Sequence, residues 1–374
     1  MTRGPGPVTR PRRWLRTITY GVVLLLVAAF VASRISLDYY VLSPGAAQSV
    51  GPLIKVPAQY AHPAHGRVLL TDVFVAPVSA LQYLPDKLSG DDQLVPTNEL
   101  TGGRDIPITE LTPQGYLEMV QAKDAAKTAA LRHLGYSVPE HAAGTVIVAV
   151  GTGTPSYGVL KVAQVVTAVN GTPTPDVCAF VRALSASGPG TTVRMSVQQN
   201  RFTPDGKFVP GPAVTKTVPL VARPPGLPDQ SGCPGVPASK GYLGVAVDTQ
   251  QDFTYPFPIT IQTPDIGGPS AGLAMTLGLL NTLSGGHLTG GRVVAATGTI
   301  APGGAVGDVG GVAQKTVAVE RAGATVFFVP GPELEAARSK AAGGLRVYAV
   351  NTLAQALAIL GRLGGHVPPA PAGP

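Results

Sequence analysis

The chain has 374 residues with a formal net charge of +7, and it is rich in glycine (47) and proline (37). This length allows two or three domains, and the glycine and proline content predicts many turns and loops. Five arginines within the first sixteen residues supply most of the charge, so the rest of the chain carries only 7 − 5 = +2. A basic stripe in the body of the protein is missing, and this excludes a nucleic-acid partner.

An apolar segment at residues 17–37 follows the basic tail of residues 1–16. It is about 20 residues long, which is enough to cross a bilayer as a helix. The arginines on its N-terminal side predict that this end stays in the cytoplasm, with the remainder outside and a single pass through the cell membrane. A cleaved signal peptide is the competing interpretation, because Val31 and Ser33 are small enough for a cleavage site, although Arg34 follows at once.

The segment between this anchor and residue 141 has one expected strand and one expected helix. The strand begins after Gly66, where apolar and β-branched residues alternate. Residues 78–112 are polar and are expected to be irregular. An apolar stripe predicts a helix over 113–134, which Gly135 ends.

Residues 144–222 form a β-rich module of their own, followed by a proline-rich linker at 223–239. Asn170-Gly171 predicts a tight hairpin turn. Cys178 and Cys233 could pair in an oxidising compartment, or one could be a buried thiol and the other exposed, and the sequence leaves both readings open. The expected elements of the module are strands at 145–150, 165–169, 191–198 and 214–221, with a helix at 175–185.

Residues 240–362 alternate between strand and helix, and residues 363–374 form a Pro/Gly/Ala tail that is expected to be disordered. Proline at 269 suits the first turn of a helix. Expected strands are 258–262, 293–300, 325–329 and 345–350, and expected helices are 269–283, 312–322 and 353–363.

Two residues in this last part predict peptidase chemistry. Ser270 lies where a glycine-rich loop enters a helix, and free backbone N–H groups at such a place can hold an oxyanion. Lys315 lies on the apolar face of a later helix, where burial disfavours its charged form. A neutral amine near Ser270 could act as the general base that takes the serine proton. The competing interpretation of Lys315 is a partly exposed lysine on a loosely amphipathic helix.

The motifs around these residues resemble the proteolytic domain of Lon proteases. They are Gly268-Pro-Ser-Ala-Gly272, Thr297-Gly298 and Gly310-Gly-Val-Ala-Gln-Lys315. The resemblance implies that Ser270 is the nucleophile and Lys315 the base, with Thr297 as a supporting residue that orients Lys315. Backbone N–H groups around Gly268, Pro269 and Ala271 would hold the oxyanion. Lon-type domains often form rings, so a homo-oligomer is one alternative.

The β-rich module resembles a PDZ domain through Leu160-Lys161, Val165-Val166 and Ala168-Val-Asn-Gly171, although Ala163-Gln164 replaces the usual Gly-Asp pair. PDZ domains bind an extended peptide as an added strand. The whole chain thus resembles the membrane-anchored PDZ–Lon proteases.

The expected fold class is multidomain α/β, with one N-terminal transmembrane helix and a PDZ-like module inserted in or preceding an α+β Lon-type proteolytic domain. We expect residues 40–141 and 240–362 to build that domain together, with the module between them.

The sequence departs from the Lon pattern at two positions. Gly267 replaces the acid three residues before the serine, although Asp265 is close by, and Thr299 replaces the acid after Thr-Gly. The motif Gly-x-x-x-x-Gly-Lys-Ser/Thr does not occur, so we expect ATP-independent cleavage of protein or peptide substrates without metal or nucleotide cofactor. Asp265 and Asp308 are expected to be turn residues rather than catalysts.

Two other functions compete with this one. Gly-x-Ser-x-Gly around Ser270 also matches the nucleophile elbow of α/β-hydrolase esterases, for which Asp308 and His366 would complete the triad. Alternatively, Gly267 and Thr299 favour a non-catalytic PDZ scaffold with a relic protease domain. The pair His62 and His65 resembles a metal motif, but a third ligand is not in view and surface histidines are the preferred interpretation.

Overall fold

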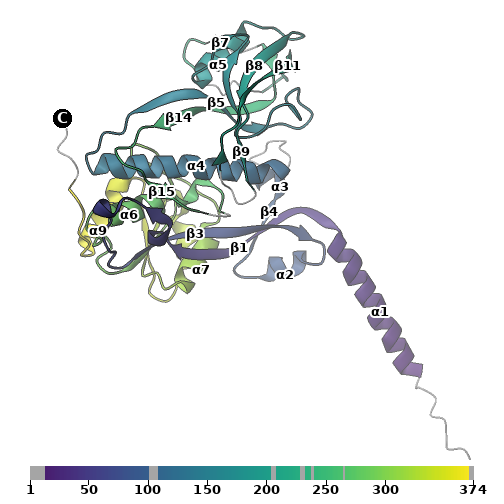
Figure 1. The fold of residues 1–374 in the computed structure, drawn as a ribbon. Coiled ribbons are helices and arrows are strands. Elements are labelled where there is room, and N and C mark those ends of the chain that lie inside the picture. The colour runs from purple at the N-terminus through teal and green to yellow at the C-terminus, as the bar shows by residue number, and fades with distance from the viewer. Residues whose placement is uncertain are drawn as a thin grey trace, which may run out of the picture. The chain divides into compact units, whose positions relative to one another are not determined.

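The computed structural model describes residues 13–100, 108–203, 208–227, 232–236, 240–263 and 266–369 (Figure 1). Several predicted segments lie outside the described residues. They are most of the basic tail, parts of the linker at 223–239, Asp265 and the end of the C-terminal tail. The chain divides into two compact units. Unit 1 comprises residues 1–43 and 74–100, and unit 2 comprises residues 44–73 and 101–374.

Unit 1 begins with helix α1 (Arg13–Arg34), whose part Thr17–Arg34 is long and apolar enough to cross a membrane. The prediction that residues 78–112 are irregular was wrong for 78–100 and 108–112, while residues 101–107 lie outside the described residues. Tertiary contacts stabilise short elements there that have no periodic signal, since Tyr83 packs edge-on against Tyr39 at 5.6 Å and β4 pairs antiparallel with β1. The further elements of unit 1 are the start of β1 (Ser36–Ser49), α2 (Tyr83–Leu88), β4 (Gln93–Pro96) and α3 (Thr97–Leu100).

A parallel sheet forms the centre of unit 2. Its strands are β3 (Arg67–Ser79, of which the first part belongs to unit 2), β16 (Val293–Ala296), β19 (Val326–Val329) and β20 (Arg346–Ala349). The strand pairs β3–β16, β16–β19 and β19–β20 are all parallel. All four strands were predicted. The predicted strand at 293–300 is interrupted at Gly298, whose φ of 143° takes the chain out of the sheet before β17 (Thr299–Ile300).

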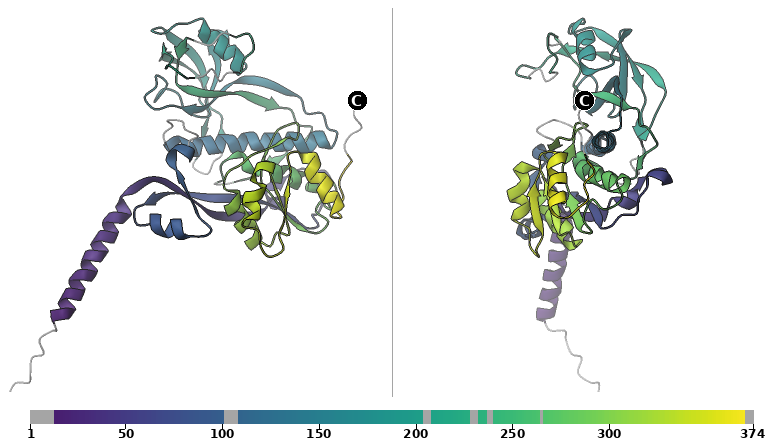
Figure 2. Two further views of the ribbon diagram at one scale, coloured as in Figure 1. Left: turned by 180° about the vertical axis from the view of Figure 1, so that it is seen from behind. Right: turned by 90° about the vertical axis from the view of Figure 1, so that its left-hand side faces the viewer.

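Helices cover both faces of this sheet, as the two views in Figure 2 also show. Val68, Leu70 and Val294 pack with one group of helices, whereas Leu69, Ala295 and Phe327 pack with the other, because side chains alternate along a strand. The first group is α4 (Ile108–His133), α6 (Gly272–Leu283) and α9 (Leu353–Arg362), and the second is α7 (Val312–Arg321) and α8 (Leu334–Arg338).

The β-rich module has its own antiparallel sheet, in the order β11-β8-β6-β5-β14. Phe180 and Leu184 of α5 are buried in its separate core. Asn170 and Gly171 both have positive φ (50° and 84°), as the predicted hairpin turn requires. The module's main elements are β5 (Glu140–Val150), β6 (Val165–Val169), β7 (Thr172–Pro173), α5 (Val177–Ser185), β8 (Thr192–Gln198), β11 (Ala213–Pro219) and β14 (Val245–Phe253).

Two features of the module are long-range. Strand β14, which the sequence analysis did not predict, pairs with β5 from the other side of the linker. Cys178 and Cys233 form a disulfide, with their Cα atoms 5.4 Å apart. The pairing that the sequence left open is therefore present, and it ties the segment 232–236 to the first turn of α5.

Short elements complete the fold. The predicted strand at 258–262 is only the two-residue β15 (Thr260–Ile261), which pairs with β2 (Ile54–Lys55). The others are β9 (Arg201–Phe202), β10 (Phe208–Val209), β12 (Val221–Ala222), β13 (Gly241–Tyr242) and β18 (Val306–Gly307).

Residues on both sides of the module contribute to one hydrophobic core. Met119, Ala126 and Ala130 of α4 pack in the same cluster as Leu273 and Leu277 of α6. We propose, as expected from the sequence, that the PDZ-like module is inserted between two parts of a single catalytic domain.

A chain of residues 240–374 alone tests this proposal. It lacks β3 and α4, so buried side chains of α6 would face water, and we expect it not to fold cooperatively. Thermal unfolding followed by circular dichroism measures this, with a chain that begins at Ser36 as the control. A cooperative transition in residues 240–374 would contradict the insertion.

Candidate active site

Ser270 lies in a single turn of 3₁₀-helix, Pro269–Ala271, that leads directly into α6. Gly268 precedes this turn with φ 87° and ψ 156°, a conformation that other residues rarely adopt. Pro269 has no N–H to satisfy at this position, which suits it to the start of a helix. The side chain of Ser270 is half-buried.

The serine turn rests against helix α4. The N–H of Gly268 donates to the carbonyl oxygen of Gly115 at 2.7 Å. A Cβ atom added to Gly267 would lie only 3.2 Å from the carbonyl carbon of Gly115. Glycine at 267, where the Lon pattern has an acid, therefore fits the close approach of α4.

Lys315 lies in α7 and is only 2% exposed, so the predicted burial of this lysine is confirmed. Val312 and Val319 of the same helix are buried in the cluster on this face of the sheet. Burial lowers the pKa of Lys315 to about 8, while the negative charges of Asp72 and Glu333 act in the opposite direction. An appreciable fraction of the amine is thus neutral near neutral pH.

Thr297 links the two predicted catalytic residues. Nζ of Lys315 donates to Oγ1 of Thr297 at 3.2 Å, and that hydroxyl donates to the backbone carbonyl oxygen of Ser270 at 3.3 Å. The N–H of Gly298 donates to the same carbonyl at 2.9 Å. Ser270, Thr297 and Lys315 therefore lie together at the carboxyl end of β16, although they come from three separate elements. Their catalytic roles remain a prediction.

The expected oxyanion donors at 268–271 are fewer than the sequence indicates. The N–H of Gly268 is bonded to Gly115, and Pro269 has no N–H. The N–H groups of Ser270 and Ala271 remain as the candidate donors from this set.

Three polar residues near this site were not predicted from the sequence. Glu333 and Asp72 influence the charge of Lys315. Oε1 of Glu333 accepts from the N–H of Val309 at 3.0 Å, while its buried Oε2 has no partner among the described residues. Thr71 is 2% exposed. Strands β3 and β16 pair in parallel, and two residues beyond their last pair this register places Thr71 level with Thr297. No local motif marks them, because they come from distant strands and turns.

The residues of the competing esterase triad do not meet. The N–H of His366 donates to the carbonyl oxygen of His287 at 3.0 Å, and His287 follows the C-terminal end of α6. Ser270 precedes the N-terminal end of that helix, which has 12 residues and is about 18 Å long. Asp308 is exposed after β18, as expected of a turn residue.

Four of the six histidines instead lie at this far end of α6. The rings of His65 and His287 are stacked with their centroids 4.1 Å apart, and the N–H of His62 donates to the carbonyl oxygen of Thr282 at 3.0 Å. A cavity of about 550 Å³ is lined by His287, Gly290, Gly364 and His366. In the part of the chain that the structure describes, no group of three or more His, Cys, Asp or Glu side chains is arranged to hold a metal ion.

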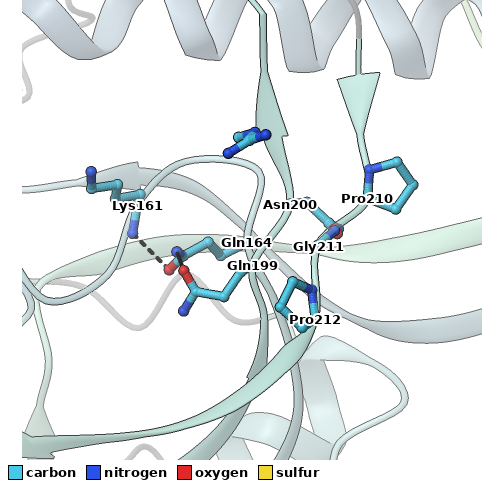
Figure 3. Close-up of a pocket in the computed structure, with 8 residues that line it drawn as sticks. Lys161, Gln164, Gln199, Asn200, Pro210, Gly211 and Pro212 are labelled. Carbon is cyan, nitrogen blue, oxygen red and sulfur yellow. Dashed lines mark hydrogen bonds between the residues drawn. The ribbon is translucent and has the colours of Figure 1, made fainter.

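The PDZ-like module has a cavity of about 300 Å³ beside the turn that departs from the family pattern (Figure 3). Ala163, which replaces the usual glycine, has φ 69°. Oε1 of Gln164 accepts from the N–H of Lys161 at 3.1 Å, and its Nε2 donates to Oε1 of Gln199 at 3.1 Å. The turn therefore forms with Ala-Gln in place of Gly-Asp. The lining residues are Lys161, Gln164, Gln199, Asn200, Arg201, Pro210, Gly211 and Pro212.

Comparison with protein families finds a match within unit 2. Residues 251–360 match the family described as the Lon protease (S16) C-terminal proteolytic domain. The matched range contains Ser270, Thr297 and Lys315. The match supports a serine peptidase of the Lon type, and together with the apolar helix α1 it agrees with the predicted architecture of a membrane-anchored PDZ–Lon protease.

Solved PDZ domains are similar to the chain over 28% of its length. One is the PDZ domain of an SdrC-like protein from Listeria monocytogenes, with 13% identity, 87% of that domain covered and a TM-score of 0.21. Another is the PDZ domain of an SdrC-like protein from Listeria innocua, with 18% identity, 92% covered and a TM-score of 0.19. These TM-scores are too low to carry an argument. Comparison with curated proteins gives no match.

Replacing Glu333 with glutamine tests its influence on Lys315. The amide oxygen can still accept from the N–H of Val309, but the negative charge that raises the pKa of Lys315 is lost. We expect the pKa of Lys315 to fall further below about 8, so that the rise of kcat/KM with pH moves to lower pH. The pH profile of peptide hydrolysis measures this shift.

The control for this prediction is Glu335→Gln, which removes an exposed carboxylate that pairs with Arg338 on the surface, at 3.4 Å. It should leave the profile unchanged. A Glu333→Gln profile that stays in place or moves to higher pH would show that Glu333 does not act on the base.

Proposed function

We propose, on the premise of a Lon-type serine-peptidase domain, that the chain is an endopeptidase in which Ser270 is the nucleophile and Lys315 the general base. The observation that carries this proposal is the hydrogen-bonded path from Nζ of Lys315 through Oγ1 of Thr297 to the backbone of Ser270. It supports a buried amine close to the serine at the entrance of a helix.

The reaction follows from the charge state of the amine. Neutral Lys315 takes the proton of the Ser270 hydroxyl as the oxygen attacks a peptide carbonyl, and then gives that proton to the leaving amine. The N–H of Ser270 and the N-terminal end of α6 stabilise the oxyanion, an effect worth about 3–4 kcal/mol for each donor. Water then attacks the acyl-enzyme as Lys315 takes its proton, and that proton passes to the oxygen of Ser270 as the ester bond breaks and the acid product leaves. Thr297 accepts a hydrogen bond from Nζ and so directs the amine toward Ser270.

The proposal includes no nucleotide or metal. In these 374 residues, Lys315 is the only lysine that follows a glycine-rich run at the start of a helix. The residue before it is not glycine, as a phosphate-binding loop would require. Without a motor to unfold its substrate, the enzyme would cleave peptides, flexible tails or segments that are already unfolded.

The site of action follows from the N-terminal helix. We propose that α1 stays in the cell membrane with the arginine-rich end in the cytoplasm and the catalytic domain outside. The disulfide between Cys178 and Cys233 supports an oxidising compartment. Substrates would then be extracytoplasmic or membrane-proximal proteins.

The PDZ-like module would recruit or gate peptides. Its strand β14 lies at the edge of the sheet, and an edge strand can accept an extended peptide as a further strand. The N–H of Val177 at the start of α5 donates to Oγ1 of Thr249 in β14 at 3.2 Å, so that helix and edge strand are neighbours.

Two substitutions test the catalytic pair. Ser270→Ala and Lys315→Ala should each lower peptide cleavage by at least about 10³-fold, because each removes a group that acts in every turnover. Cleavage is measured with a quenched fluorescent peptide, and thermal unfolding checks that both variants fold. Full activity in either variant would retire the mechanism, and an inactive wild-type protein would favour the relic scaffold.

Replacing His366 with alanine separates this peptidase from an esterase. His366 contacts His287 at the far end of α6, so we expect the variant to keep its peptidase activity within about twofold. Hydrolysis of the peptide and of a simple ester substrate is compared with that of the unmodified protein. Loss of both activities with an intact fold would restore the Ser–Asp–His triad.

A further inference from the structure

Unit 1 carries three exposed leucines on one side of a short helical segment. Leu81, Leu84 and Leu88 are 46%, 60% and 76% exposed. Their spacing of three and four residues puts them on the same face of α2 and the turn that precedes it. We call these three residues the leucine face. Nothing in the described part of the chain covers it.

The opposite side of the same helix is occupied. Tyr83 packs against Tyr39 of β1 with ring centroids 5.6 Å apart, and Nζ of Lys87 lies 5.6 Å from the centre of the Tyr83 ring. Helix α2 therefore has a defined inner side, and the leucine face points outward because of this packing.

The leucine face is tied to the end of α1. Helix α1 ends at Arg34 and β1 begins at Ser36, so one residue, Ile35, separates them. The N–H of Ala80 donates to the carbonyl oxygen of Ile35 at 2.9 Å. Leu81 is the next residue along the chain, which holds the leucine face beside the point where α1 ends.

We propose that the leucine face inserts into the headgroup region of the membrane that α1 crosses. The proposal rests on the membrane anchor proposed above and adds a second, peripheral contact of unit 1 with the lipid. A bilayer is the occupant that the tether brings to this surface, since the apolar part of α1 ends at Arg34. Leucine side chains suit the apolar side of this interface.

Charge attraction would not drive this contact. The described residues of unit 1 from Arg34 onward contain five acids (Asp38, Asp86, Asp91, Asp92 and Glu99) and two bases (Arg34 and Lys87). Anionic lipid would repel this surface, so insertion depends on the apolar side chains and should occur with zwitterionic lipid alone.

Tryptophan fluorescence in the full chain tests the proposal. Trp14 is the only tryptophan, so variants built on Trp14→Phe report from one introduced position. Leu84→Trp and Leu88→Trp are placed on the leucine face. Leu25→Trp marks the interior of α1, and Glu99→Trp is the matched control on a polar part of unit 1. Each variant is reconstituted in phosphatidylcholine vesicles with lipid brominated near the headgroup or at the chain ends.

We expect headgroup-proximal bromine to quench the tryptophans at 84 and 88 by about half, and the one at 99 hardly at all. Suppose that bromine at the chain ends quenches the tryptophan at position 25, but the tryptophans at positions 84 and 88 are not quenched. This result would overturn the insertion and leave the anchor intact. Absence of quenching at all positions would overturn both. Blue-shifted but unquenched emission at 84 and 88 would assign the surface to a second copy of the chain instead. Peptide cleavage by the same samples tests the proposed peptidase separately.

Discussion

The burial of one amine at the end of a parallel strand is the constraint on which the catalytic domain depends. Lys315 is 2% exposed, and removing its solvent lowers its pKa from 10.5 to about 8. This shift corresponds to about 3 kcal/mol at 1.4 kcal/mol per unit. Because the folded pKa is lowered, the unfolded state binds more protons between pH 8 and 10.5, and native stability falls as pH drops through this window. The packed helices on both faces of the sheet offset this cost.

The carboxyl end of β16 also explains how residues from opposite faces of the sheet meet. Ser270 belongs to the turn before α6 on one face, and Lys315 belongs to α7 on the other. Thr297 follows β16 and contacts both, and Gly298 then takes the chain out of the sheet so that its N–H reaches the carbonyl of Ser270. Side chains from the two layers can approach one another at the carboxyl end of a parallel sheet, where ligand sites of α/β folds commonly lie.

Local patterns in the sequence were enough to locate Ser270 and Lys315 on their structural elements. Glycine and proline around Ser270, and apolar spacing around Lys315, indicated a helix entrance and a buried lysine without knowledge of their neighbours. The contact of Gly268 with Gly115, the pairing of β14 with β5, and the influence of Glu333 depend on residues far apart in the chain. Periodicity carries no information about such pairs. The short elements of unit 1 were missed for the same reason, since β4 exists only as a partner of β1.

The charge state of Lys315 gives the most direct test of the proposed mechanism. Protein with ¹³C-labelled lysine ε-carbons can be titrated by NMR, with the Lys315→Arg variant used to assign the signal. We predict that the Lys315 signal titrates near pH 8, well below the signals of the exposed lysines. A signal that titrates near 10.5, like that of a solvated lysine, would contradict a buried amine poised to take the proton of Ser270.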